Sequence, residues 1–125
     1  MQARDIGALG ERTAAAYLRR NGYAIVGANV RTRFGEIDII ASNKAYLAFV
    51  EVKTRAENAR FLPREAVDIR KQARIVKTAL LYLTAHPTPL QPRFDVIEVI
   101  SGTDGDFSRC TIRHLPNAFS APSGY

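Results

Sequence analysis

The chain has little cysteine, no long apolar run and no uncharged N-terminal segment, and each shortage excludes a class of protein. Its single cysteine, Cys110, cannot form an intrachain disulfide, which favours a reducing compartment. The longest apolar runs, 45–50 and 79–83, are far shorter than the roughly 20 residues that cross a bilayer. Arg4 and Asp5 make the start of the chain unlike a signal peptide. We therefore expect a cytoplasmic protein with no membrane partner.

Histidine and negative charge are also scarce. His86 and His114 are too far apart, and too poorly accompanied, to indicate a zinc site. Eighteen basic residues face twelve acidic ones, for a net charge of +6, and fourteen of the eighteen are arginine. The planar fork of arginine matches phosphate with two parallel hydrogen bonds. The balance favours a polyanionic partner such as nucleic acid, although a role in solubility alone explains it equally well.

Apolar periodicity and turn residues predict the order helix, three strands, long helix, strand. The expected elements are a helix over 5–21, strands over 23–30, 35–41 and 46–53, a polar loop over 54–63, a helix from Pro63 to about 85, and a strand over 93–100. A fifth strand over 107–114 is left open, with a loose tail over 115–125. A helix-length crossover makes the third and fourth strands parallel. The prediction is one α/β domain, 1–114, with a mixed central sheet flanked by helices.

Charged residues interrupt two of the predicted strands. The segments are GEIDII at 35–40 and FVEVK at 49–53. Burying ionised side chains is unfavourable by several kcal/mol unless they are paired or bind a metal. Asp38, Glu51 and Lys53 therefore need compensation, and the best candidate is a divalent cation together with a phosphate substrate.

Strand alternation groups these charges. A two-residue turn at 43–44 would pair Asp38 with Phe49 and Glu36 with Glu51. Side chains alternate with period two along a strand. Glu36 and Asp38 of the second strand would therefore share one face of the sheet with Glu51 and Lys53 of the third. Asp38 and Glu51 would then lie roughly 7–8 Å apart at the backbone, close enough for their carboxylates to reach one Mg²⁺ ion.

Two further polar residues lie within apolar helical stripes. Glu11 shares a stripe with small apolar residues of the first helix, and Gln72 shares one on the long helix. Both stripes must pack on the sheet, so both side chains are expected at the same polar pocket. The alternatives are an ion pair of Glu11 with Arg12 or Arg19, and a satisfied, half-buried amide at Gln72.

The sequence resembles the YraN-like family. The resemblance lies in the segments GEIDII at 35–40 and FVEVK at 49–53, together with Gly10-Glu11, KQARI at 71–75 and RFDV at 93–96. That family is similar to the PD-(D/E)XK restriction-endonuclease-like superfamily and to archaeal Holliday junction resolvases. The superfamily pattern is an acid on the second strand, then acid-x-lysine on the third. It carries over onto Asp38, Glu51 and Lys53, and a helical glutamate of the resolvases matches Glu11 by position. Ile37 stands where the superfamily name has proline.

The resemblance implies a restriction-endonuclease-like fold and metal-dependent hydrolysis of DNA phosphodiester bonds, including branched or structured DNA. Asp38 and Glu51, with the carbonyl of Val52, would hold Mg²⁺ or Mn²⁺, and Glu11 would add a ligand directly or through water. Lys53 would orient the attacking water and stabilise charge on the phosphate. Gln72 would orient a metal ligand.

Several assignments stay open at this stage. The expected phosphate contacts are Arg31, Arg33, Arg55 and Lys71. Glu36 is either a peripheral ligand or a partner of Arg33 or Arg55. Two rivals remain: a nucleic-acid-binding module that does not cut, and a protein–protein adaptor in which Glu51 and Lys53 form an ordinary ion pair. The choice of DNA over RNA, and pairing of two copies as a homodimer, are also undecided.

Overall fold

The computed structural model describes residues 3–57, 67–102 and 107–121, which form two α-helices around a five-stranded sheet. In chain order the elements are α1 (Ala3–Arg20), β1 (Ala24–Thr32), β2 (Gly35–Ser42), β3 (Tyr46–Ala56), α2 (Ile69–Ala85), β4 (Gln91–Ser101), the short 3₁₀ helix η3 (Phe107–Arg109) and β5 (Thr111–Phe119). The predicted α/β class and the order helix, three strands, helix, strand are confirmed. This order is compatible with the nuclease-like fold.

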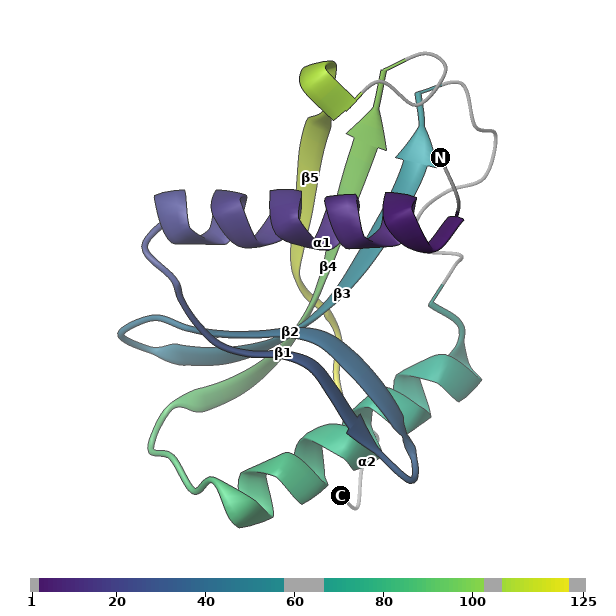
Figure 1. Ribbon diagram of the computed structural model, residues 1–125. Helices are drawn as coiled ribbons and strands as arrows, with labels where there is room; N and C mark the ends of the chain where they lie inside the picture. The colour runs from purple at the N-terminus through teal and green to yellow at the C-terminus, as the bar shows by residue number, and fades with distance from the viewer. Residues whose placement is uncertain (1–2, 58–66, 103–106, 122–125) are drawn as a thin grey trace.

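The strands lie in the order in which they occur along the chain, from β1 to β5. All neighbours are antiparallel except β3 and β4, which are parallel as the α2 crossover predicts. A bulge between Ile25 and Gly27 interrupts the β1–β2 pairing, as the glycine in that strand suggests. In Figure 1 the β1–β2 hairpin runs across the view below α1, while β3, β4 and β5 rise behind the helix.

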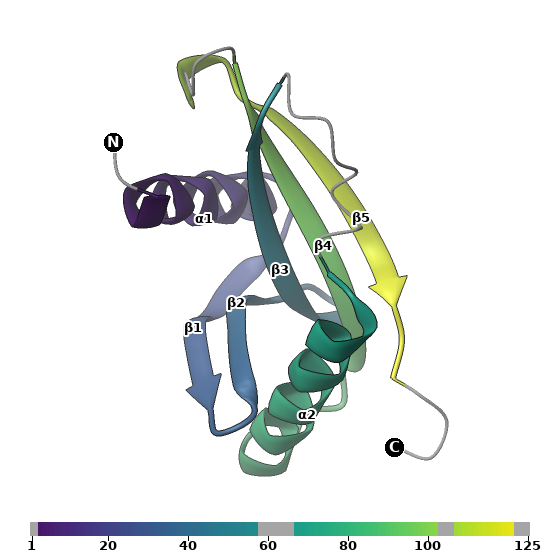
Figure 2. The ribbon, with the colours of Figure 1, turned by 90° about the vertical axis from the view of Figure 1, so that its right-hand side faces the viewer.

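The two helices cover opposite faces of the sheet, and each buries its own apolar cluster (Figure 2). On one face, Leu18 of α1 packs with Val50 and Ile97, and all three are buried. On the other, Val76 of α2 packs with Phe49. Among the described residues, neither helix is long and apolar enough to cross a membrane.

Gly10 lets α1 lie close to β3. A Cβ at this position would collide with the hydroxyl of Thr54. The helix then ends where Gly22 adopts a φ of +88°, a conformation that favours glycine. The close approach at Gly10 places the next residue, Glu11, over the sheet.

The start of α2 differs from the prediction. Asp68 is its N-cap, since the carboxylate accepts a hydrogen bond from the backbone N–H of Lys71 at 2.9 Å. The helix therefore begins at Ile69, whereas Pro63 lies outside the described residues. The loop expected from residue 54 is also wrong in part, because β3 continues to Ala56.

The C-terminal strand is longer and later than expected. Residues 107–109 form a 3₁₀ turn, and β5 pairs with β4 from Thr111 to Phe119. The expectation of a loose tail from Leu115 is therefore wrong for 115–119. The reason is apolar packing: Leu115 lies opposite Val96, and the Phe119 ring stacks on Phe94 with the centroids 5.2 Å apart.

A buried polar cluster joins β4, β5 and α1. The Asp95 side chain is 0% exposed and accepts two hydrogen bonds from the guanidinium of Arg93, at 2.8 and 2.7 Å. It is also 2.7 Å from Nε2 of His114 and accepts the backbone N–H of Asn117 at 3.0 Å. Tyr17 of α1 contacts Nδ1 of the same imidazole. The buried Asp95 carboxylate thus has several hydrogen-bonding partners, as an interior carboxylate requires.

Candidate active site

β2 and β3 pair only as far as Ile39 and Val50, and Asp38 lies where the described pairing ends. Its Oδ2 accepts a hydrogen bond from the backbone N–H of Val52 at 2.9 Å, so the carboxylate sits in the opening between the strands. Asp38 consequently lines two hollows. One lies beside Glu11 under α1, and the other lies beside Glu51 near α2.

The predicted register of this hairpin is wrong by two residues. The turn spans four residues, because Oδ1 of Asn43 accepts the N–H groups of Ala45 and Tyr46 at 2.9 and 2.8 Å. Phe49 therefore faces Ile40 rather than Asp38. A shift of two leaves every side chain on its expected face. Three of the four residues expected on this face, Glu36, Asp38 and Glu51, line one cleft of about 180 Å³, and the fourth, Lys53, contacts Glu51.

Two lysines hold the Glu51 carboxylate. Its Oε1 lies 2.6 Å from Nζ of Lys71 and 3.3 Å from Nζ of Lys53, and its side chain is 7% exposed. Burial, and then the neighbouring Lys71 amine, lower the pKa of Lys53. Burial opposes charge on Lys71 as well, but its hydrogen bonds to Glu51 and Lys53 outweigh this and raise its pKa. The structure thus brings the acid-x-lysine motif together with Lys71 of α2.

Asp38 is the least compensated acid of the site. Burial first, and the Glu51 carboxylate second, raise its pKa from 3.8 to about 7, against the lowering effect of the Val52 N–H group. The carboxylates of Glu11 and Glu36 make smaller contributions to this rise in pKa. A carboxyl in this state gains from any cation that enters the cleft.

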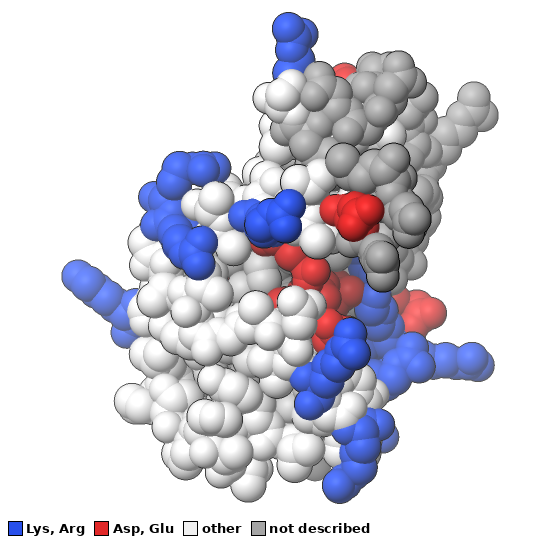
Figure 3. All heavy atoms as spheres, in the orientation of Figure 1, with Lys and Arg blue, Asp and Glu red and all other residues white. Residues whose placement is uncertain are grey.

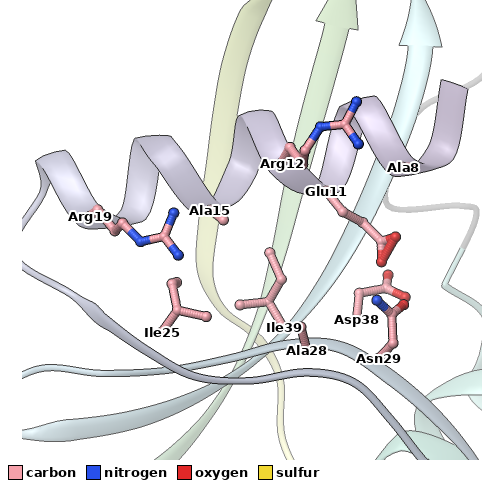
Figure 4. A pocket seen from close by; sticks show the side chains of 10 residues that line it. All are labelled: Ala8, Glu11, Arg12, Ala15, Arg19, Ile25, Ala28, Asn29, Asp38 and Ile39. Carbon is pink, nitrogen blue, oxygen red and sulfur yellow. The ribbon is translucent and has the colours of Figure 1, made fainter. Parts of the chain in front are cut away.

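Glu11 reaches the opening from α1. Its carboxylate and that of Asp38 point toward each other in Figure 4, with Asn29 beside them. Burial, and then the charges of Glu36 and Glu51, raise the pKa of Glu11. The described residues include no ion pair of Glu11 with Arg12 or Arg19, so the alternative of a helix-edge ion pair does not hold.

Asn29 connects two of the acids. With its amide nitrogen turned toward them, the orientation that satisfies all three groups, it donates to Oε1 of Glu11 and to Oε1 of Glu36, each at 2.9 Å. Its φ of 51° is one that asparagine tolerates better than most residues. Sequence reasoning missed Asn29; an asparagine just after the glycine of a strand bulge is the signal that was available.

Asn29→Asp tests this bridge. We expect the free energy of unfolding to fall by about 1 kcal/mol at pH 8, because a donor to two carboxylates becomes a third acid. Much of the loss should return at pH 5, where Asp38, whose pKa is raised to about 7, is protonated. Urea unfolding at both pH values measures this, with Asn29→Gly as the uncharged control that tolerates the same φ. An equal loss for Asn29→Asp at both pH values would contradict the bridge.

Several predicted site residues lie elsewhere. The amide of Gln72 donates to the carbonyl of Val67 at 2.9 Å and does not line the cleft, which favours the satisfied-amide alternative over a positioning role. Arg55 is turned inward, with Nη2 3.7 Å from Oε2 of the buried Glu98, and this makes it a poor phosphate contact. The partner of Glu36 is Arg31, 3.4 Å away, rather than either arginine that we expected.

The remaining predicted cations stay near the cleft. Arg31 is 78% exposed, and the guanidinium of Arg33 lies over the Phe34 ring, 4.8 Å from its centroid, at the tip of the β1–β2 hairpin. Sequence reasoning missed Arg74, which lines the cleft together with Lys71. The spacing of three residues along one helix was the available signal, since such residues share a face.

The site suits a hard divalent cation. Four carboxylates surround the opening, and carboxylate oxygens are the ligands that Mg²⁺ prefers. As placed, no three acid, histidine or cysteine side chains in the described ranges converge tightly enough to enclose an ion. Mg²⁺, however, commonly uses only one or two protein carboxylates together with waters and substrate phosphates. Asp38 and Glu51 could supply such carboxylates, and a cation there would offset both the burial and the carboxylate repulsion that raise the pKa of Asp38.

The amino-acid sequence of this chain is similar to those of one protein family. The model of the uncharacterised protein family UPF0102 matches residues 10–99. A UPF0102 protein of Clostridium botulinum strain 657 is 46% identical over 118 residues, which cover 93% of this chain and 94% of that protein. A UPF0102 protein of Symbiobacterium thermophilum is 46% identical over 122 residues, 95% of this chain and 99% of that protein. The chain belongs to the UPF0102 family.

Membership of UPF0102 confirms the resemblance to YraN-like proteins that the sequence motifs indicate. A third UPF0102 protein, of Chlorobium phaeobacteroides strain BS1, is 44% identical over 119 residues, 92% of this chain and 94% of that protein. The range that the UPF0102 model matches includes all the acids and lysines described above: Glu11, Glu36, Asp38, Glu51, Lys53 and Lys71.

Proposed function

We propose that this UPF0102 protein is a metal-dependent endonuclease that hydrolyses phosphodiester bonds of DNA, including branched or structured DNA. One observation carries the proposal: Asp38 is held in the strand opening beside Glu51, and Lys53 contacts the Glu51 carboxylate. A phosphate in this cleft would meet carboxylates able to share a cation with it and ammonium groups able to bind its oxygens.

Each residue has a role in this proposal. Asp38 and Glu51 would hold Mg²⁺ or Mn²⁺, with Glu11 and the carbonyl of Val52 as further donors. A bound divalent ion would polarise the phosphate and lower the pKa of a bound water. Lys53 would donate a hydrogen bond to that water and stabilise charge on the phosphoryl oxygens. Lys71 contacts Glu51 at 2.6 Å in the free protein. When substrate binds, its ammonium group would leave this carboxylate and bind a phosphate oxygen instead.

The surroundings suit a polyanion. Acidic side chains gather in a hollow of the face shown in Figure 3, and basic side chains lie around them. Two cations of α2, Lys71 and Arg74, line the cleft. Two more, Arg31 and Arg33, lie at the end of the β1–β2 hairpin, close in sequence to Glu36. They would contact backbone phosphates, which position a nucleic acid without reading its sequence.

One observation favours a rival, a nucleic-acid-binding module without nuclease activity. The Glu51 carboxylate is already neutralised by two lysines, so a cation has to compete with them. The first experiment therefore offers labelled linear, flapped and four-way DNA, and RNA, to the protein with Mg²⁺ or Mn²⁺. Metal-stimulated cleavage supports the nuclease, whereas salt-dependent binding without cleavage supports the rival.

Lys53→Ala should lower the cleavage rate by about 10²–10³-fold, because one charged donor to the phosphate and water is lost. DNA affinity should change little, since other cations contact the backbone. Lys44→Ala, which alters an exposed lysine in the β2–β3 turn, is the matched control. If Lys53→Ala cuts as fast as the parent, Lys53 is not a catalytic residue.

A further inference from the structure

A cavity of about 520 Å³ lies between α1 and the strands β1 and β2, directly beside the proposed site. Asp38 lines both this cavity and the smaller cleft that holds Glu51 and Lys71. The two hollows therefore meet at the carboxylate that the proposed nuclease uses. Nothing in the proposed chemistry requires the larger one.

The lining of the cavity is divided by chemistry. Ala15 of α1, Ile25 and Ala28 of β1, and Ile39 of β2 form an apolar stretch along its length. The acids Glu11 and Asp38 lie together at one end, as Figure 4 shows.

Two arginines also line the cavity, together with Ala8 and Asn29. Arg12 and Arg19 extend from α1, and both are exposed. In Figure 4 the guanidinium of Arg19 lies near Ile25, away from the acid end. The cavity thus offers an uncharged wall, a cationic rim and an anionic end.

We propose that this cavity receives the nucleoside of an unpaired nucleotide next to the scissile phosphate, an inference that rests on the proposed function. A phosphate held in the cleft of Glu51 and Lys71 would present its attached sugar and base to the cavity that opens at Asp38. A base and sugar are uncharged and partly apolar, which suits the stretch formed by Ala15, Ile25 and Ile39. A guanidinium plane such as that of Arg19 stacks well on a base.

The volume agrees with this occupant, since small-molecule sites commonly measure about 300–1,000 Å³. A base inside a continuous duplex is stacked and paired, so it would not enter without being extruded. The cavity therefore selects strands with unpaired nucleotides, such as flaps, junction arms or single strands. The apolar wall cannot hydrogen-bond to base edges, and the amide of Asn29, which also lines the cavity, already bridges Glu11 and Glu36, so we expect no preference for base identity.

The test measures binding without metal, so that cleavage cannot interfere. Fluorescence anisotropy with EDTA present compares a labelled 12-nucleotide single strand with the matching blunt duplex. Ala28→Leu fills the cavity from an exposed strand position, and Ala24→Leu makes the same change on β1 outside the lining. Arg19→Ala removes the rim cation, and Arg20→Ala is its neighbour outside the lining.

We expect Ala28→Leu and Arg19→Ala each to weaken single-strand binding about tenfold while duplex binding changes less than about twofold. Both controls should bind like the parent. The inference is overturned if neither cavity variant weakens single-strand binding, or if duplex binding falls equally. Arg19→Ala keeps the test decisive should Ala28→Leu unfold, which thermal melting would reveal.

These outcomes are separate from those of the proposed function. If the parent cuts DNA and the cavity variants bind single strands normally, the nuclease stands and the cavity inference falls. If the parent cuts nothing but Ala28→Leu and Arg19→Ala lose single-strand binding, the cavity inference stands as a feature of a binding module.

Discussion

Asp38→Asn is expected to lower the rate of metal-dependent DNA cleavage by at least about 10³-fold. The amide has nearly the same size and its oxygen still accepts the Val52 N–H group, so the strand opening should persist. What is lost is the negative charge that would hold the proposed cation between Asp38 and Glu51. DNA affinity should stay within about threefold of the parent, because the proposed phosphate contacts are arginine and lysine side chains.

The same substitution should raise stability at high pH. The folded pKa of Asp38 is raised from 3.8 to about 7, so its stabilising contribution is complete below the unfolded value and is lost as pH rises through 7. Above that pH the parent carries an ionised, crowded carboxylate. We therefore expect Asp38→Asn to exceed the parent by about 1 kcal/mol or more in free energy of unfolding at pH 8, and by less at pH 5.

Asp5→Asn, at an exposed acid in the first turn of α1, is the control for both measurements. It should neither slow cleavage nor change the pH dependence of urea unfolding in the absence of metal. An Asp38→Asn variant that cuts like the parent would show that the site is assigned wrongly. An unchanged pH profile of stability would contradict the electrostatic account of the strand opening.

Asp95→Asn should give the largest loss of stability. Removing one partner of a buried ion pair typically lowers the free energy of unfolding by about 3–5 kcal/mol, because the other charge stays buried. Here Arg93, whose side chain is 12% exposed, would lose both hydrogen bonds to a carboxylate. His114 and the N–H group of Asn117 would lose their charged acceptor as well.

The pH dependence of this effect has the opposite sign to that of Asp38. Burial favours the neutral acid, but hydrogen bonds from His114, Arg93 and Asn117 outweigh it and lower the pKa of Asp95 below 3.8. Its contribution is therefore present above pH 3.8 and is lost as pH falls through the lowered value. The difference between parent and Asp95→Asn should be full at pH 7 and shrink below about pH 4.

Urea unfolding across this pH range measures the effect. Asp68→Asn is the control, because asparagine caps a helix as well as aspartate does, and it should change stability by less than about 0.5 kcal/mol. A loss at Asp95 no larger than that of the control would mean that the cluster contributes little to the fold.

The sequence was most informative where local chemistry decides structure. Asp38, Glu51 and Lys53 stand out because charge is rare in strands that are otherwise apolar. Alternation with period two then placed them on one face, and that conclusion survived a register error of two residues. Glu11 was found for the same reason, as an acid within an apolar helical stripe.

Features set by contacts distant in sequence were not predictable. The inward turn of Arg55 depends on Glu98 of the neighbouring parallel strand. Asn29 acts only because a bulge and a helix bring Glu11 within reach. The length of β5 depends on Phe119 stacking on Phe94, although proline at 116 and serine nearby are typical of a tail.

Titration calorimetry with Mn²⁺ tests the central claim most directly, because it needs neither a substrate nor an assumed cleavage preference. The account predicts saturable binding heat for the parent protein, strongly reduced in Asp38→Asn and unchanged in Asp5→Asn. Absence of binding heat in the folded parent, or equal heat in Asp38→Asn, would contradict a metal site between the strands.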